Sequence, residues 1–383
     1  MLLPYDPKPL SELADELDRL RAQLDYRGPI PRTWAGRLRR DLEAEAVAAS
    51  TSMEGVPVTV EEVHRILAGD RPPETKEADA KLVLGYRDAM SFVLRRADDA
   101  AFRWDRELLI GLQDRILGGH WADGAGRLRA GAAYVVDNRT GGVAFRPPPA
   151  EEIAGLVDEA CAAIQAGLPH PALAAGWVHV ALAAIHPFRD GNGRAARVAA
   201  SLAMYRGGFK LPEFTSLEEW WGRHRAEYYA AFRCLGDTFS RDADVTPFLR
   251  AHMEAQLHQV RALQIRERVQ QRIWMVVEET VTAAGLQPRV ANAVWDAFFG
   301  RAVTPRYYRP LADVSPATAT NDLAAAVAAG LLRPEGHARS RQYGAGAALY
   351  TRIASALGIR VDEAGAPARA IIIGELTRRV VAP

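Results

Sequence analysis

The sequence predicts a mostly α-helical fold. Most of the chain carries apolar residues at three- and four-residue spacing, the pattern of helices with one buried face. These stretches are residues 10–24, 34–49, 60–67, 76–94, 105–117, 151–166, 171–185 and 218–235. At 383 residues the chain exceeds the usual size of a single core, so we expect more than one domain.

One segment departs from the helical pattern. Residues 132–136 and 143–145 are rich in valine and aromatic residues and flank a stretch, 137–142, that contains Asn and Gly. Two short runs of this kind, joined by such a stretch, are typical of a β-hairpin. A run of three prolines at 147–149 then ends the second strand, because proline cannot continue a sheet ladder. We therefore expect a hairpin over residues 132–145 on a helical core.

The composition changes toward the C-terminal end. A charged connecting helix is expected over 256–284. Thr304 and Ser315 each precede a proline, the pairing of an N-cap residue with the first helical position, so two short helices are predicted to start there. After Gly330, short runs at 331–333 and 341–343 are candidate strands of a wing. The predicted division is an N-terminal helical region over 1–80, a core over 81–255, and a linker helix with a winged-helix-like domain over 256–383.

Charge and composition narrow the choice of partners. The 48 basic and 47 acidic residues leave a net charge of +1, so no global field steers the protein toward nucleic acid or membranes. The beginning of the sequence lacks a signal-peptide pattern, and no apolar run reaches the ~20 residues that span a bilayer. Cys161 and Cys234 are far apart without a CxxC pattern, which indicates neither a disulfide framework nor a zinc site. We expect a cytoplasmic protein without a membrane partner.

The most informative segment is a loop followed by a helix. Residues 186–197 read HPFRDGNGRAAR. Pro187 breaks the preceding helix, and the backbone of Gly191, Asn192 and Gly193 can turn successive N–H groups inward. These groups, together with the positive end of the next helix, form an anion-binding pocket.

Charged side chains complete this pocket. Arg194 and Arg197 are three residues apart on the helix and share a face, where they place two cations beside a chain of phosphates. Asp190 offers a carboxylate suited to Mg²⁺. His186 has an imidazole with a pKa suited to take a proton from a hydroxyl nucleophile. The set predicts phosphate transfer chemistry.

This segment resembles the HxFx[D/E]GNGRxxR motif of the Fic family and matches it at every defined position. Members of that family have a helical fold and mostly transfer AMP from ATP to protein hydroxyls. The resemblance implies His186 as general base, Asp190 as Mg²⁺ ligand, Gly191, Asn192 and Gly193 as the phosphate cradle, Arg194 and Arg197 as contacts of the phosphates including the γ-phosphate, and Phe188 as the anchor of the loop.

The resemblance therefore implies a protein adenylyltransferase that uses ATP and Mg²⁺ and modifies a Ser, Thr or Tyr hydroxyl of a target protein, and of itself. The kinase-like branch of the family typically has a bulkier residue in place of Gly193, which argues against phosphorylation here. Transfer of UMP or phosphocholine, and removal of AMP, stay open as alternatives.

Residues 50–55 read STSMEG and resemble the family's inhibitory motif, [S/T]xxxE[G/N], at the end of a helix that precedes the core. By this resemblance Glu54 pairs with Arg197 and occupies space meant for the γ-phosphate. ATP is then held in a pose that in-line attack cannot use. The resting enzyme is expected to have low activity.

Two other segments resemble parts of the family that bind ligands. The hairpin 132–145 is similar to the flap, which pairs with the target's acceptor segment as an added strand. Residues 225–229 read RAEYY and are similar to the RxxYY helix, which makes Tyr228 and Tyr229 candidates for the adenine pocket.

The C-terminal module suggests a second functional hypothesis, which is DNA binding. A winged helix over 304–343 with nearby arginines would allow DNA binding; these arginines are Arg306, Arg309, Arg333, Arg339 and Arg341. However, its second helix, 316–329, has no Arg or Lys for base contacts. We therefore favour a protein-interaction role over DNA binding. A homodimer is a further open alternative, and no segment specifies its interface.

Overall fold

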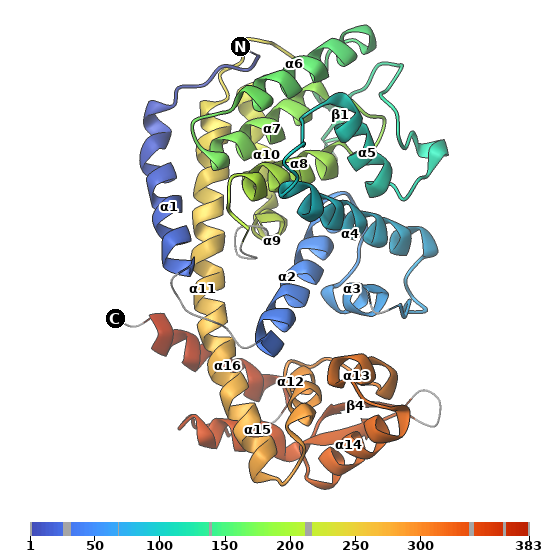
Figure 1. Ribbon diagram of the computed structural model, residues 1–383, viewed down its shortest axis with the longest axis vertical. Coiled ribbons are helices and arrows are strands. Elements are labelled where there is room, and N and C mark those ends of the chain that lie inside the picture. The colour runs from blue at the N-terminus through green and yellow to red at the C-terminus, as the bar shows by residue number, and fades with distance from the viewer. Residues whose placement is uncertain are drawn as a thin grey trace. The chain divides into compact units, whose positions relative to one another are not determined.

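The computed structural model confirms the mostly helical fold. It describes residues 2–25, 32–67, 69–137, 140–210, 217–336, 341–362 and 365–381. The chain forms two units, Met1–Arg261 and Ala262–Pro383, whose elements are labelled in Figure 1. The helices of the first unit are α1 (Ser11–Asp25), α2 (Arg32–Met53), α3 (Val60–Leu67), α4 (Glu77–Ala97), α5 (Arg106–Ile116), α6 (Ile153–Ala166), α7 (Pro171–Ile185), α8 (Asn192–Arg206), α9 (Leu217–Arg223), α10 (Arg225–Ala231) and the beginning of α11 (Thr246–Ala283).

The helices α7 and α8 form the centre of the first unit (Figure 1). α7 is apolar on nearly every side, and most of its residues are buried. His170 begins this helix, because its ring accepts a hydrogen bond from the Ala172 N–H at 3.1 Å, and Pro171 fills the first helical position. α6 packs against α7, while α4 and α5 pack against α8. The loop between α7 and α8 is therefore held by the most buried part of the molecule.

The predicted hairpin is present. β1 (Val135–Val136) and β2 (Val143–Phe145) pair antiparallel, with Val135 opposite Phe145 and a register shift between the two residues of β1. Part of the predicted turn, residues 138–139, lies outside the described residues. The backbone of Arg146 donates to Asp237 O and accepts from Phe239 N, both at 2.9 Å. These bonds fix the base of the hairpin to the segment that follows α10.

The single helix predicted over 218–235 is wrong in its continuity. The structure has α9, α10 and a 3₁₀ turn (Phe232–Leu235) in its place. The interruption is at His224, whose backbone has φ −118° and ψ 47° and whose ring stacks on Trp220 with 3.9 Å between ring centroids. Because both short helices keep an apolar face, the periodicity continues through the break and does not reveal it.

The second unit contains the two helix starts predicted from Thr304 and Ser315. Thr304 accepts a hydrogen bond from Tyr307 N and Ser315 accepts one from Thr318 N, each at 3.2 Å. The two predicted strands are also present and pair antiparallel, with Leu332 opposite Ala345. The connecting helix α11 begins at Thr246, earlier than predicted. The elements that follow it are α12 (Ala291–Phe298), α13 (Pro305–Ala312), α14 (Pro316–Ala328), β3 (Leu332–Glu335), β4 (Gln342–Ala345), α15 (Ala347–Ala356) and α16 (Ala366–Val381).

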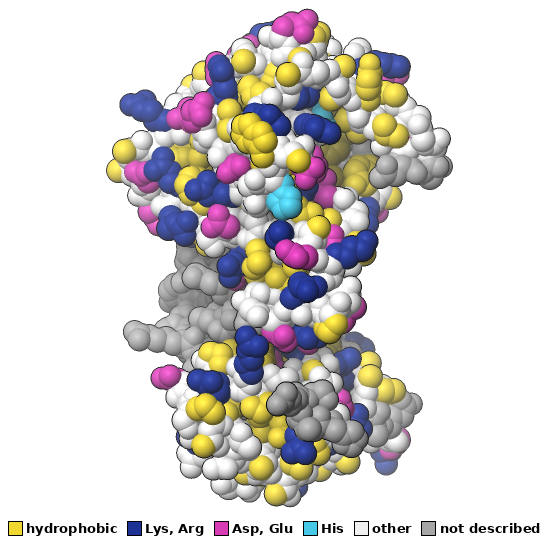
Figure 2. Space-filling model, turned by 90° about the vertical axis from the view of Figure 1, so that its right-hand side faces the viewer, with side chains coloured by type: hydrophobic (Ala, Val, Ile, Leu, Met, Phe, Trp, Pro, Cys, Tyr) yellow, Lys and Arg dark blue, Asp and Glu magenta, His cyan; other side chains and the backbone are white. Residues whose placement is uncertain are grey.

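The surface carries both signs of charge. On the face shown in Figure 2, Lys and Arg side chains are interspersed with Asp and Glu, as the net charge of +1 leads one to expect. None of the described helices combines the length and apolarity that crossing a bilayer requires.

Candidate active site

The loop between α7 and α8 begins with a strained residue. His186 is the C-cap of α7, and its backbone is left-handed, with φ 51° and ψ 58°. Its N–H still donates to Leu182 O at 2.9 Å. A residue other than glycine in this region costs on the order of 1–2 kcal/mol, so surrounding contacts must hold it. The left-handed turn ends the helix at the residue predicted to act as the base.

Arg129 supplies such contacts. Its Nε donates to His186 O at 2.7 Å, and its backbone N–H donates to Pro187 O at 2.9 Å. Its two other nitrogens donate to Gly131 O at 2.7 Å and Pro148 O at 2.5 Å, on either side of the hairpin. Arg129 therefore fastens the base of the hairpin to the loop. This role could not be predicted from the sequence, because Arg129 lies outside any periodic or motif segment.

The middle of the loop is closed by a pair of reciprocal bonds. Asn192 Oδ1 accepts from Phe188 N at 2.9 Å, and Asn192 Nδ2 donates to Phe188 O at 2.8 Å. The Phe188 ring is buried in the core, as expected of an anchor. Since both polar atoms of the Asn192 side chain are used within the loop, what Asn192 can offer an anion is its backbone N–H.

Gln113 of α5 was also missed. This buried side chain donates to Asp190 O at 3.0 Å and accepts from Gly126 N at 2.8 Å. It holds the loop at Asp190, whereas Arg129 holds it at His186 and Pro187. The apolar periodicity of α5 gave no signal for it, because a buried glutamine does not interrupt that pattern.

The N-terminus of α8 has no side-chain cap. Its N-cap is Gly191, with φ 82°, and glycine has no side chain to satisfy the first N–H groups of the helix. These donors and the positive end of the helix dipole point into the space that follows the loop. An uncapped helix N-terminus is the feature on which the predicted anion pocket depends.

Arg194 indicates most directly that an anion belongs in this pocket. Its side chain is 3% exposed and has one ion pair, at 3.4 Å to Asp190 Oδ1. Within the part of the chain that the structure describes, its Nε and Nη1 atoms have no hydrogen-bond partner. Leaving buried charged donors unpaired is costly, so acceptor oxygens from a ligand are expected here.

Glu54 occupies part of the pocket. It follows the end of α2, and its Oε1 accepts from Arg197 Nη2 at 2.8 Å. A Cβ atom added to Gly193 would lie only 2.4 Å from the same oxygen. The carboxylate thus packs directly against the first turn of α8, where any side chain at position 193 would displace it. The structure thus brings Glu54 into contact with Arg197 of the motif helix, as expected from the sequence.

Ser50 adds two contacts to Arg197 from the same segment. Arg197 Nε donates to Ser50 Oγ at 2.9 Å, and Arg197 Nη2 donates to Ser50 O at 3.1 Å. The end of α2 therefore binds the Arg197 guanidinium through a hydroxyl, a carbonyl and the Glu54 carboxylate.

The environment sets the charge of both Glu54 and His186. Burial raises the pKa of Glu54, but the charge and hydrogen bond of Arg197 outweigh it, so the net pKa is lowered from its usual value. Burial lowers the pKa of His186, and the nearby Arg129 charge acts in the same direction. At neutral pH the carboxylate is therefore ionised and the imidazole is neutral, the form that can accept a proton.

Asp190 fits the ligand set that Mg²⁺ uses beside nucleotides. Its side chain is 54% exposed at the head of the anion pocket, and its Oδ1 accepts from Gly191 N. The described residues contain no group of three or more His, Cys, Asp or Glu side chains that could hold a metal. A single carboxylate is sufficient for Mg²⁺ when phosphate oxygens and water complete the shell.

The two tyrosines predicted near the nucleotide base differ in exposure. Tyr228 is 4% exposed, and its OH accepts from Arg197 Nη1 at 3.3 Å. Tyr229 is 56% exposed, and its OH donates to Met53 O at 3.3 Å. Of the two rings, that of Tyr229 is the one accessible for stacking.

Comparison with known proteins agrees with this geometry. Residues 103–204 match the sequence model of the Fic/DOC family. The chain is 38% identical over 86 residues to protein adenylyltransferase fic-1 of Caenorhabditis elegans, covering 22% of this chain and 15% of that protein. It is 25% identical over 246 residues to protein adenylyltransferase Fic of Nematostella vectensis, covering 62% of this chain and 52% of that protein. The chain thus spans about half, or less, of the length of these relatives.

Solved structures show the same fold. A Fic family protein from Desulfovibrio desulfuricans G20 superposes with a TM-score of 0.60 at 20% identity, over 90% of this chain and 98% of that one. Fic-1 from C. elegans superposes with a TM-score of 0.55 at 22% identity, over 66% of this chain and 71% of that one. At this level of identity the similarity establishes the fold alone.

Proposed function

We propose that the protein is an adenylyltransferase that transfers AMP from ATP to a Ser, Thr or Tyr hydroxyl of a target protein, and to itself. The match of residues 103–204 to the Fic/DOC family model supports this proposal. One observation carries the proposal. The buried Arg194 guanidinium has two nitrogens without a partner among the described residues, at a helix N-terminus next to a neutral imidazole. A nucleotide polyphosphate supplies the oxygens that these donors require.

The reaction assigns each group of the pocket a task. His186 takes the proton of the acceptor hydroxyl as its oxygen bonds to the α-phosphorus, and the bond to the β-phosphate oxygen breaks in line. The leaving pyrophosphate gains negative charge, which Arg194, Arg197 and the N–H groups of α8 stabilise. Mg²⁺ bound at Asp190 would neutralise further phosphate charge. The left-handed backbone of His186, held by Arg129, fixes the position of the base relative to the phosphates.

In this proposal Glu54 inhibits AMP transfer in the resting enzyme. Its carboxylate lies against Gly193 and pairs with Arg197, where the γ-phosphate would bind. A carboxylate at this position repels the γ-phosphate. It also occupies Arg197, one of the two cations proposed to bind the phosphates. Because the lowered pKa keeps Glu54 ionised at neutral pH, protonation does not relieve the inhibition there. Displacement of the end of α2 is required.

The hairpin and Tyr229 are proposed to bind the two substrates. The hairpin exposes Tyr134, Val136 and Val143, and its two strands leave an edge to which an extended segment of the target can add. The accessible ring of Tyr229 lies close to the end of α2 through its bond to Met53 O. We assign it to stacking on the adenine base.

The transferred group can be identified by mass. The full-length Glu54→Gly variant, incubated with Mg²⁺ and ATP, is expected to gain adducts of the mass of AMP, because the pocket binds the polyphosphate as the leaving group. Parallel incubations with UTP, CDP-choline and GTP test the alternative groups. Intact-protein mass spectrometry reads out all of them. A phosphate-sized adduct, or an adduct formed only from another nucleotide, contradicts AMP transfer.

The C-terminal unit is proposed to be a winged-helix-like module that presents or recognises protein. Its order of helices followed by the β3–β4 hairpin supports this assignment. The exposed positions of α14 are occupied by uncharged residues, which are Pro316, Ala317, Thr320, Asn321, Ala324, Ala325 and Ala328. A helix that reads DNA normally presents side chains that reach base edges and phosphates.

DNA binding by this unit has a distinct signature. Phosphate contacts release counterions, so true binding weakens steeply as salt rises. An electrophoretic mobility shift with duplex DNA at about 50 and 200 mM salt is expected to show no salt-sensitive complex. A complex that is tight at low salt and lost at high salt would favour a DNA-binding regulator instead.

A further inference from the structure

Among the described residues, the Arg197 guanidinium has one hydrogen-bond partner outside the segment 50–55. Three of its contacts come from Ser50 and Glu54 at the end of α2. The fourth is from Nη1 to the Tyr228 OH at 3.3 Å, on α10. When the end of α2 moves away, the first three contacts are lost and the phenol remains. Tyr228 is thus the contact that can keep Arg197 oriented in the active state.

Among the residues that the structure describes, the Tyr228 hydroxyl has one partner that can accept its proton. Arginine nitrogens are donors only, so the phenol oxygen accepts from Arg197 and must donate its own proton elsewhere. Its other partner is His179 Nε2, on α7, at 3.1 Å. That nitrogen must therefore be the acceptor, which leaves the proton of a neutral imidazole on Nδ1.

The surroundings of His179 favour this neutral form. The side chain is 1% exposed, and its ring lies among those of Phe232, Phe248 and His252 at centroid distances of 6.0, 5.4 and 5.5 Å. Burial lowers the pKa of His179 well below its usual value, and the neighbouring His252 and Arg197 act in the same direction. Burial raises the pKa of Tyr228 to about 12. Both members of the pair are uncharged at neutral pH.

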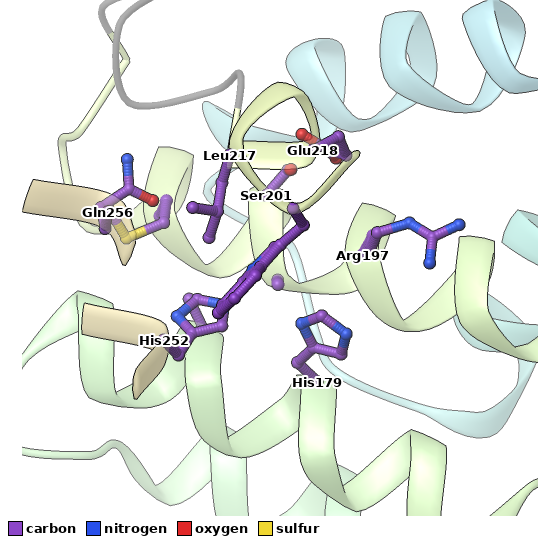
Figure 3. Close-up of a pocket in the computed structure, with 11 residues that line it drawn as sticks. His179, Arg197, Ser201, Leu217, Glu218, His252 and Gln256 are labelled. Carbon is purple, nitrogen blue, oxygen red and sulfur yellow. The ribbon is translucent and has the colours of Figure 1, made fainter. Parts of the chain in front are cut away.

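The other ring nitrogen of His179, Nδ1, carries the proton and needs a hydrogen-bond acceptor. No protein atom of the described residues accepts its hydrogen. His179, His252 and Arg197 line a common cavity of about 20 Å³ (Figure 3). That volume is sufficient for one water molecule, which can accept from an imidazole N–H. A metal does not account for the two imidazoles, because the described part of the chain has no third His, Cys, Asp or Glu side chain that could complete a site with them.

We propose that Tyr228 and His179 are positioning residues that hold the Arg197 guanidinium for the nucleotide phosphates, through a hydrogen-bond chain from His179 Nε2 to Tyr228 OH to Arg197. This role rests on the proposed function. It differs from that function in assigning the buried imidazole of α7 a fixed tautomer and a share in binding ATP.

ATP affinity tests the chain in the full-length Glu54→Gly protein. Tyr228→Phe and His179→Phe each remove one link while keeping an aromatic ring, and each is expected to weaken ATP binding about tenfold, since bonds to charged groups are among the stronger ones. The double variant is expected to lose no more than either single variant, because both act through one chain. Isothermal titration calorimetry measures all three. Additive losses, or an unchanged affinity in His179→Phe, would overturn the proposal.

Two further variants separate hydrogen bonding from packing. His179→Gln keeps an acceptor near the position of Nε2 and is expected to retain most of the affinity. Phe232→Leu removes a ring that packs on Tyr228 and His179, at 5.1 and 6.0 Å, without entering the chain. It is expected to leave ATP affinity unchanged while lowering the melting temperature. A loss of affinity in Phe232→Leu as large as that in His179→Phe would mean that packing alone is responsible.

The tautomer gives a readout that does not depend on catalysis or on folding of any variant. In the unmodified protein, two-bond ¹⁵N–¹H spectra are expected to show His179 neutral and protonated on Nδ1 at neutral pH. Protonation on Nε2, or a charged ring, would overturn the assignment. A protein that shows this spectrum but forms no AMP adduct would refute the proposed function and leave the hydrogen-bond chain intact, so the two failures are distinguishable.

Discussion

Replacing Glu54 with glycine is expected to raise auto-AMPylation by about 10- to 100-fold, the range that corresponds to losing one hydrogen bond between charged groups, about 1.5–3 kcal/mol. The substitution removes the carboxylate from its place against Gly193 and frees Arg197 Nη2 for phosphate. Transfer of label from α-labelled ATP to the protein measures the effect. Position 54 follows the last residue of α2, so glycine there does not interrupt the helix.

Two matched variants identify the cause of this increase. Glu54→Gln keeps the size of the side chain and removes its charge, so it is expected to fall between the parent protein and the glycine variant. Glu74→Gly removes an exposed carboxylate whose side chain is 64% accessible and whose nearest basic partner is 3.9 Å away. It is expected to leave the rate unchanged. If Glu54→Gly labels no faster than the parent protein, Glu54 does not inhibit.

The helical fold and the identity of the pocket could be predicted from sequence because both depend on local patterns. The apolar residues of 171–185 predict both the extent of α7 and the residue at which it ends. The residues of the motif, from His186 to Arg197, are contiguous in the sequence. The pairing of Glu54 with Arg197 joins distant segments. It was predictable because each segment resembles a motif, and not because any physical pattern in the sequence links the two.

The residues that the sequence did not reveal act through backbone atoms or through distant partners. Arg129 contacts carbonyl groups of His186, Gly131 and Pro148. Carbonyl groups are present at every residue, so the sequence carries no sign of which ones an arginine will meet. His179 occupies an apolar helix position where imidazoles are common core residues, and its hydrogen bond to Tyr228 depends on how α7 and α10 pack. The break at His224 was hidden for the same reason, because packing determines it.

The proposed role of His186 as the base depends on its charge and its backbone. Its lowered pKa keeps the imidazole able to accept a proton at neutral pH. Its left-handed conformation means that a substitution can disturb the loop as well as remove the imidazole. A test of the base must therefore separate these two effects. Asparagine is suited to this purpose, since it adopts the left-handed region more readily than most residues.

His186→Ala and His186→Asn are both expected to reduce AMP transfer by about 10²- to 10⁴-fold in the Glu54→Gly protein, the usual contribution of a general base. ATP affinity is expected to remain close to that of the parent, because in the proposed complex Arg194, Arg197 and the N–H groups of α8 hold the phosphates. Single-turnover label transfer measures the first quantity and calorimetry the second. If the asparagine variant retained transfer near the parental rate while alanine did not, the backbone of residue 186 would matter and its imidazole would not be the base. An equal loss of transfer in both variants, with ATP still bound, assigns proton removal to the imidazole. The asparagine variant preserves the loop geometry, so its loss of transfer reflects the missing imidazole and not a disturbed backbone.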